Sequence, residues 1–252
     1  MLLDLWLLLL GFVAGVFGSM IGLGGGIVVV PVLTFFGFPP ALAASNSLFA
    51  AFSNAIASSV SYARQKRIEY LIGLKFGLLA IPGTVIGAFI SHDILPSLFK
   101  ILFGIVLIAS SFYIFSRRKM ESKEHNLSKQ IMLLATGASF FAGIIYSLFG
   151  IGGGIVFVPL MVIAVGLSMK IAAPTSQFIL LFVSASGMTV HAFLGHPDFY
   201  QALLLALGAF GGGLLGSKLS LELEEKKLRI LVTVVMIAAA IKLFIDSWEG
   251  PF

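Results

Sequence analysis

The sequence predicts an all-helical polytopic membrane protein built from two related halves. Of its 252 residues, 59% are hydrophobic and only 11% are charged, and the mean hydropathy is +1.08. Soluble domains carry about 25% charged residues, so this chain has too little polar surface for water. A second observation is a series of apolar segments long enough to cross about 30 Å of hydrocarbon as helices. A third is a glycine-rich motif that occurs in both halves.

The composition also excludes several classes of function. The chain contains no cysteine, which excludes thiol catalysis, iron–sulfur ligation and cysteine zinc sites. Its net charge of +5 comes from basic residues scattered in short loops, where they are orientation signals rather than a nucleic-acid surface. We expect no cofactor, no metal and no nucleic-acid partner.

Apolar stretches account for nearly the whole chain. They cover residues 2–38, 41–63, 71–91, 98–115, 131–167, 171–194, 199–219 and 228–245. Two of them are broken by glycine clusters, at 22–26 and at 150–154. Because no Lys or Arg lies in residues 1–6, we expect the first stretch to be a membrane segment rather than a cleaved signal. The predicted organisation is a first transmembrane repeat at 1–116, a cytoplasmic connector at 117–129 and a second transmembrane repeat at 130–252.

The glycine clusters belong to an internal duplication. The sequence GLGGGIVVVP at 22–31 recurs as GIGGGIVFVP at 150–159, with eight identities in ten positions at an offset of 128. After one inserted residue the offset becomes 129, which aligns Gly87 with Gly216. Internal repeats are typical of secondary transporters, in which two related halves enclose a site near the middle of the bilayer.

The distribution of Lys and Arg predicts opposite orientations for the two halves. The loops at 64–75 and 218–229 each hold four of these residues and the connector holds five, whereas the loop at 195–198 holds none. Under the positive-inside rule the rich loops are cytoplasmic. Because the rich loop at 64–75 aligns with the empty loop at 195–198, we favour an inverted repeat. Each glycine-broken stretch is then a hairpin and both termini lie outside; the alternative is two parallel halves with single broken spans.

The glycine clusters are the first candidate site. A break in a membrane helix frees backbone groups that lipid cannot satisfy, so it is tolerated only where it is buried in protein or lines a polar cavity. The short helix after each cluster points its first N–H groups and its positive dipole end at the break, which suits an anion. The alternative is that these glycines only permit close packing. The candidate binding glycines are Gly24, Gly25, Gly26, Gly152, Gly153 and Gly154.

Glycines also recur at four-residue spacing in later segments. Such spacing lets two helix backbones approach closely, and we interpret these positions as packing seams. They are Gly83, Gly87, Gly208, Gly212 and Gly216. None of the glycine-rich stretches is a nucleotide-binding loop, because the Gly-Lys-Ser/Thr of a P-loop and the third glycine and acid of a dinucleotide fingerprint are missing.

Polar residues recur early in the segment that follows each short helix. The sequence Ser45-Asn46-Ser47 in the first half aligns with Pro174-Thr175-Ser176 in the second. These side chains either donate hydroxyl and amide hydrogens to the ligand or serve only as helix caps. The candidate binding residues are Asn46, Ser47, Thr175, Ser176 and Gln177.

His191 is the remaining candidate. An ionisable residue within or near a span is a functional candidate, and a histidine can carry a proton at physiological pH. We therefore consider His191 for proton coupling, with an interfacial role as the alternative; its equivalent in the first half is Tyr62. No Lys, Arg, Asp or Glu lies in the middle of a predicted span. This pattern disfavours a carboxylate-driven cation exchanger and favours an anion held by helix ends, amides and hydroxyls.

The doubled motif resembles the TauE/SafE sulfite exporter family, also called the TSUP family. Each copy of G-x-G-G-G, followed by a hydrophobic run and proline, precedes an A-A-x-[NT]-S segment. The resemblance covers essentially the whole chain. It implies a duplicated inner-membrane transporter of sulfite, sulfoacetate or related organosulfonates, commonly working outward. Carried over by position, the glycine motif falls on 22–31 and 150–159, and the polar segment falls on Asn46, Ser47, Thr175 and Ser176.

We therefore expect a secondary transporter, not an enzyme, that exports small sulfur-containing anions by alternating access. The ligand is expected where the two glycine hairpins approach each other. A proton or a sodium ion is the candidate coupling ion, the lipid bilayer is the other partner, and a homodimer is left open. The alternatives are a passive anion channel and a transporter of a non-sulfur small organic anion. The expected location is the cell inner membrane.

Overall fold

The computed structural model confirms the predicted helical fold class. It describes residues 5–116, 129–150, 154–222, 230, 233–234, 237–238 and 240–245. The helices in these ranges are α1 (Leu5–Ile21), α2 (Gly26–Phe35), α3 (Pro40–Arg64), α4 (Tyr70–Asp93), α5 (Pro96–Ser116), α6 (Lys129–Phe149), α7 (Gly154–Ile163), α8 (Met169–Phe193) and α9 (Phe199–Leu219). Nearly all of the predicted connector and much of the last predicted segment lie outside the described residues.

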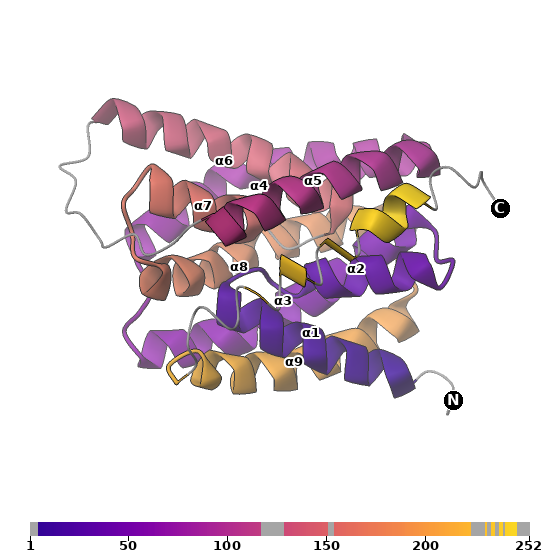
Figure 1. Ribbon diagram of the computed structural model, residues 1–252, viewed down its shortest axis with the longest axis horizontal. Helices are drawn as coiled ribbons and strands as arrows, with labels where there is room; N and C mark the ends of the chain where they lie inside the picture. The colour runs from indigo at the N-terminus through magenta and orange to yellow at the C-terminus, as the bar shows by residue number, and fades with distance from the viewer. Residues whose placement is uncertain are drawn as a thin grey trace.

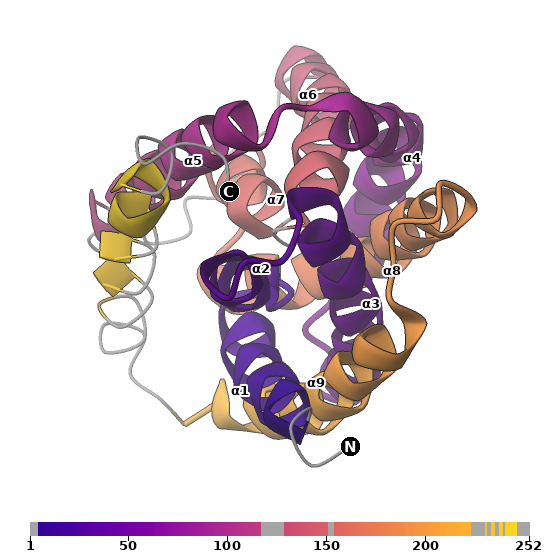
Figure 2. The ribbon, with the colours of Figure 1, turned by 90° about the vertical axis from the view of Figure 1, so that its right-hand side faces the viewer.

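The long helices lie roughly along one axis (Figure 1). In the part of the chain that the structure describes, four helices are long and apolar enough to cross a membrane: α4, α8, α9 and the 132–149 portion of α6. α3 is 25 residues long, but its many Ser and Asn side chains make it less apolar. A polar helix of this length is stable in a bilayer when other helices surround it, and α3 lies well inside the bundle in the end-on view (Figure 2).

The first glycine-broken stretch is a helical hairpin. α1 ends at Ile21, and α2 begins after a short turn at Gly26. The ring of Trp6, near the start of α1, lies 5.0 Å from the ring of Phe36, just beyond the end of α2. The chain therefore returns to the end of the bundle from which it started.

α3 and α8 run in opposite directions. Asn46, near the start of α3, bonds to Gln201, which follows the end of α8, with 3.3 Å between the amide nitrogen and oxygen. At the other end, the Nε of Arg67, just beyond α3, donates to the carbonyl oxygen of Lys170 in the first turn of α8 at 3.0 Å. The start of each helix thus lies near the end of the other.

The first helix of each predicted half packs against the other half. Figure 2 shows α1 beside α9 on one side of the bundle and α6 beside α4 on the other. Glycines make these approaches close: a methyl group at Gly212 would collide with the carbonyl oxygen of Phe12, and one at Gly83 would collide with that of Phe140. The prediction that the four-residue glycine spacing forms packing seams is confirmed at Gly83, Gly87, Gly208, Gly212 and Gly216.

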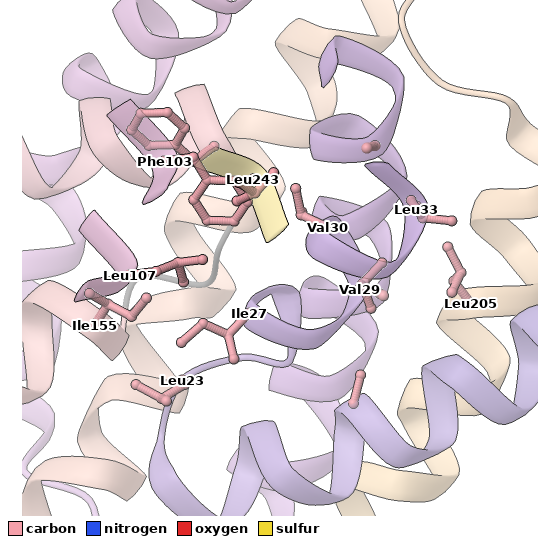
Figure 3. Close-up of a cluster of buried hydrophobic side chains, with 14 of the residues drawn as sticks. Leu23, Ile27, Val29, Val30, Leu33, Phe103, Leu107, Ile155, Leu205 and Leu243 are labelled. Atoms are coloured by element: carbon pink, nitrogen blue, oxygen red, sulfur yellow. The ribbon is translucent and has the colours of Figure 1, made fainter. Parts of the chain in front are cut away.

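The short helix α2 is enclosed by apolar side chains. Its Val29, Val30 and Leu33 are completely buried. Figure 3 shows them in a cluster that also contains Ile27 of α2 and its counterpart Ile155 of α7. The helix that follows the first glycine break is therefore buried in protein, as a break in a membrane helix requires.

Candidate functional site

The two glycine breaks meet each other in the interior. Gly154, the first residue of α7, lies so close to the first break that a methyl group there would collide with the carbonyl oxygen of Gly22. Residues 22–26 are all buried. Of the predicted binding glycines, Gly154 lies against the first break and Gly24, Gly25 and Gly26 lie within it. Gly152 and Gly153 lie outside the described residues.

The first break is a turn that only glycine accommodates well. Gly22, Gly24 and Gly25 have φ values of 82°, 78° and 85°, a left-handed region that costs other residues about 1–2 kcal/mol. The N–H of Gly24 donates to the carbonyl of Gly18 at 3.2 Å and closes α1. Among the described residues, no backbone acceptor faces the N–H of Gly26, the first residue of α2. The start of α2 therefore presents a free amide inside the protein.

Ser47 and Ser176 each hold the break of the opposite half. The hydroxyl of Ser47 in α3 donates to the carbonyl oxygen of Gly150 at 2.7 Å. The hydroxyl of Ser176 in α8 donates to the carbonyl oxygen of Gly22 at 2.8 Å. Because both hydrogens are used, these serines stabilise the breaks in this structure and do not offer a donor to a ligand.

Asn46 and Thr175 point to opposite ends of the bundle rather than to one site. The Oδ1 of Asn46 accepts a hydrogen bond from the N–H of Asp198 at 3.1 Å, and the Oγ1 of Thr175 accepts one from the N–H of Glu69 at 3.0 Å. Asp198 directly precedes α9, and Glu69 directly precedes α4. Each side chain thus fixes the start of a neighbouring helix.

Gln177 lies at the first break. Its Nε2 donates to the carbonyl oxygen of Gly18 at 2.7 Å, the same oxygen that receives the N–H of Leu23 at 2.8 Å. Its Oε1 accepts from the hydroxyl of Ser58 at 3.2 Å. Gln177 therefore joins α8 and α3 to the end of α1.

His191 is completely buried in α8 and repeats a contact of the first half. Its Nε2 lies 3.1 Å from the carbonyl oxygen of Ser147. In the first half, the hydroxyl of Tyr62 donates to the carbonyl oxygen of Ser19 at 2.7 Å. His191 differs in having a second polar partner, because its Nδ1 lies 2.8 Å from the Nδ1 of His196.

Some buried polar groups have no hydrogen-bond partner among the described residues. They include the hydroxyl of Ser45, which belongs to the recurring polar segment, the hydroxyl of Ser147 and both amide atoms of Asn54. Ser147, His92 and His196 are not among the residues predicted from the sequence. His196 and His92 form ring contacts at the end of the bundle opposite Arg67. The repeat offers a signal for Ser147, because it aligns with Ser19, but none for the two histidines.

The buried polar side chains of the described residues are uncharged types. Among the described residues, the buried polar side chains include Ser, Thr, Asn, Gln and His but no Lys, Arg, Asp or Glu. Basic residues gather at one end, where Arg67 donates to the carbonyl of Lys170 and to the hydroxyl of Ser220, both at 3.0 Å. Partial burial lowers the pKa of Arg67 from its ordinary value.

A buried helix hairpin enclosed by membrane-length helices places the chain among multi-pass membrane proteins. The family model described as "Sulfite exporter TauE/SafE" matches residues 7–243, and the chain belongs to this family. The "Probable membrane transporter protein YunE" of Bacillus subtilis is 32% identical over 98% of both chains. The "Probable membrane transporter protein MJ0441" of Methanocaldococcus jannaschii is 30% identical over 91% of both chains. No solved structure gives a significant match.

These similarities confirm the predicted family and the membrane location. They also agree with the prediction that the chain is a transporter rather than an enzyme. As a transporter, it has a small-molecule substrate and the lipid bilayer as partners.

Proposed function

We propose that this protein is a secondary transporter that exports small sulfur-containing anions such as sulfite, sulfoacetate or organosulfonates. The observation that carries this proposal is the meeting of two buried glycine breaks, with Gly154 against Gly22. The family description as a sulfite exporter supports the choice of sulfur anions. The ligand binds at the N-termini of α2 and α7, where the candidate glycines lie.

The binding energy comes from neutral groups. A helix N-terminus stabilises an anion by about 1 kcal/mol, and by up to about 2 kcal/mol where it is partly buried. The free amide at Gly26 supports this role, as does the lack of buried Lys and Arg among the described residues. With two dipoles and no fixed cation, we expect modest affinity, which suits a transporter that must release its substrate.

Alternating access moves one half against the other. The bonds from Ser47 to Gly150 and from Ser176 to Gly22 cross between residues 1–116 and 130–252. In this state Gly154 packs directly against the carbonyl of Gly22. We therefore propose that these two bonds close the path and that they break alternately as each side opens.

The two halves form an inverted repeat, with both termini outside and the connector at 117–129 in the cytoplasm. The opposite directions of α3 and α8 support this arrangement, as does the hairpin that brings Phe36 back to Trp6. The basic end around Arg67 supports the cytoplasmic assignment, because cytoplasmic loops are rich in Lys and Arg.

Counterflow in proteoliposomes tests the function. The purified protein is reconstituted, and uptake of labelled sulfite is measured against internal sulfite, sulfoacetate, taurine, sulfate or acetate. We expect saturable exchange for the sulfur anions and none in empty liposomes or with Gly25→Leu. Flux that does not saturate indicates a passive channel instead, and exchange with acetate but not with sulfur anions indicates a transporter of organic acids.

A further inference from the structure

Three histidines form a continuous chain from the surface to the interior. The Nδ1 of His92, exposed at the end of α4, lies 2.8 Å from the Nε2 of His196. The Nδ1 of His196, half-buried in the loop before α9, lies 2.8 Å from the Nδ1 of His191. The Nε2 of His191, which is completely buried, lies 3.1 Å from the carbonyl oxygen of Ser147.

The bonding partners assign the hydrogens of this chain. A carbonyl oxygen only accepts, so the Nε2 of His191 carries hydrogen and its Nδ1 is an acceptor in the neutral ring. His196 must then donate through Nδ1 and accept at Nε2, which makes the Nδ1 of His92 the donor. All three neutral rings therefore donate inward, toward Ser147, and the exposed His92 keeps a free acceptor nitrogen.

The three histidines are hydrogen-bonded in series and do not form a metal site. His196 contacts its two neighbours through opposite ring nitrogens, so the three rings do not converge on one point. Within the described part of the chain, no group of three His, Cys, Asp or Glu residues could hold a metal ion.

The inner end of the histidine series lies beside the second glycine break. Ser147 precedes Gly150 by less than one helical turn, and its buried hydroxyl has no hydrogen-bond partner among the described residues. A methyl group at Gly187 would lie 3.4 Å from this hydroxyl and 3.2 Å from Leu48. The free hydroxyl thus lies where α6, α8 and α3 meet.

We propose that His92, His196 and His191 relay protons between the exposed end of the bundle and an oxyanion bound beside Ser147, so that anion transport is coupled to proton movement. This inference rests on the transport function proposed above. It favours weakly acidic oxyanions such as sulfite, which accept a proton near neutral pH, over sulfonates, which do not.

In the proposed transfer, one proton moves through the three histidines for each anion. A proton binds the Nε2 of His92, and the hydrogen on its Nδ1 moves to the Nε2 of His196. The hydrogen on the Nδ1 of His196 moves to the Nδ1 of His191, whose Nε2 hydrogen leaves the carbonyl of Ser147, passes to sulfite bound beside it and forms hydrogen sulfite. During export the same steps run in reverse, and hydrogen sulfite gives its proton to His191. Each ring ends neutral with its hydrogen on the other nitrogen, so the rings must reorient before the next transfer.

The groups around the three histidines favour their neutral forms. Partial burial and the neighbouring His92 lower the pKa of His196 below the usual histidine value. The nearby acids are Asp93, adjacent to His92, and Asp198, whose Oδ1 is occupied by the N–H groups of Tyr200 and Gln201. From α6, Tyr146 is the titratable group near the inner end, and its hydroxyl bonds to Ser184.

The first half supplies a matched variant. Tyr62 at the position equivalent to His191 makes the same bond to a carbonyl, with no second ring nitrogen. His191→Tyr should therefore keep a donor to Ser147 while interrupting the relay. His196→Gln interrupts it one step farther out, and His125→Gln, in the predicted connector, is the control histidine.

Sulfite flux and internal pH, read with a trapped dye, are measured in proteoliposomes with and without a pH gradient. If one proton moves with each anion, a gradient of about one pH unit shifts anion accumulation about tenfold. Wild type and His125→Gln should show this shift. His196→Gln should lose it while keeping equal-pH counterflow, and His191→Tyr should lose it as well. Imidazole should restore it in His196→Ala, which a structural role does not predict.

The outcomes separate the two proposals. Wild-type counterflow without a response to the gradient overturns the relay and leaves the transporter proposal intact. A full gradient response in His191→Tyr and His196→Gln also overturns the relay. Absence of any anion flux in wild type overturns the transport function, and the relay with it.

Discussion

Ser176 donates a hydrogen bond to the carbonyl of Gly22 at 2.8 Å, and this bond joins the second half of the chain to the helix break of the first. Ser47 makes the reciprocal bond to Gly150 at 2.7 Å. A break exposes backbone carbonyls that lipid cannot satisfy, and here the partner half satisfies them. Neither break is therefore complete without the other half.

The first prediction concerns these two serines. Ser176→Ala leaves the buried carbonyl of Gly22 without this donor, and we expect a loss of about 1–3 kcal/mol in the free energy of unfolding. Ser47→Ala should lose a similar amount. Unfolding in detergent measures both. Thr189→Ala is the control, because its exposed hydroxyl only bonds to the carbonyl of Ala185 in its own helix; equal losses in all three variants would contradict the cross-half role.

The second prediction separates backbone strain from collision at the first break. Gly25 and Gly37 have nearly the same φ, 85° and 81°, so alanine at either position costs about 1–2 kcal/mol of strain. A methyl group at Gly25 would also lie 2.8 Å from the carbonyl oxygen of Ala14, whereas one at Gly37 has nothing within 4 Å. We expect Gly37→Ala to transport normally and Gly25→Ala to lose sulfite counterflow and more stability. Equal behaviour of the two variants would show that the turn has room for a side chain.

The third prediction compares adjacent glycines in α9. A methyl group at Gly212 would collide with the carbonyl oxygen of Phe12 in α1, while one at Gly211 would lie 3.5 Å from the Phe12 ring. Replacing Gly by Ala inside a helix gains up to about 1 kcal/mol where space allows. We therefore expect a higher melting temperature for Gly211→Ala and a lower one for Gly212→Ala. A stable Gly212→Ala variant would mean that the contact between α1 and α9 is looser than the structure shows.

The helices and their breaks could be predicted because membrane solvation acts locally. A run such as 199–219 is apolar enough to cross the bilayer whatever its neighbours are, and it is helix α9 in the structure. The cluster at 22–26 interrupts a helix because three of its glycines adopt positive φ. The apolar character of a span and the glycine content of a break can each be read from a short stretch of sequence.

The side-chain partners could not be predicted because they depend on which segments meet in space. Ser47 looks like a ligand or a cap in sequence, but its hydroxyl bonds to Gly150, a residue 103 positions away. His92 and His196 are 104 positions apart and lie at non-equivalent positions of the repeat. No periodicity relates such residues, and only the packing of α4 against α8 brings them together.

The fourth prediction is a pH dependence of stability that involves His196. Its pKa is lowered in the folded protein by partial burial and by His92, whereas an unfolded histidine titrates at about 6.5. As the pH falls through 6.5, the unfolded state therefore binds more protons and stability decreases. We expect the melting temperature to fall between pH 8 and pH 5.5, and to fall less in His196→Gln than in His125→Gln. An unchanged slope in His196→Gln would show that this ring does not titrate in that range.

The fifth prediction tests the orientation of the two halves. The chain has no cysteine, so Lys66→Cys and Phe193→Cys each introduce a single thiol. Both positions are exposed, with Phe193 at 88%. Lys66 lies just beyond α3, and Phe193 is the last residue of the equivalent helix α8. In an inverted repeat they lie on opposite sides, so an impermeant maleimide added to intact cells should label Phe193→Cys and spare Lys66→Cys until the membrane is permeabilised. Protection of both thiols in intact cells would instead indicate two parallel halves, because α3 and α8 would then both end in the cytoplasm.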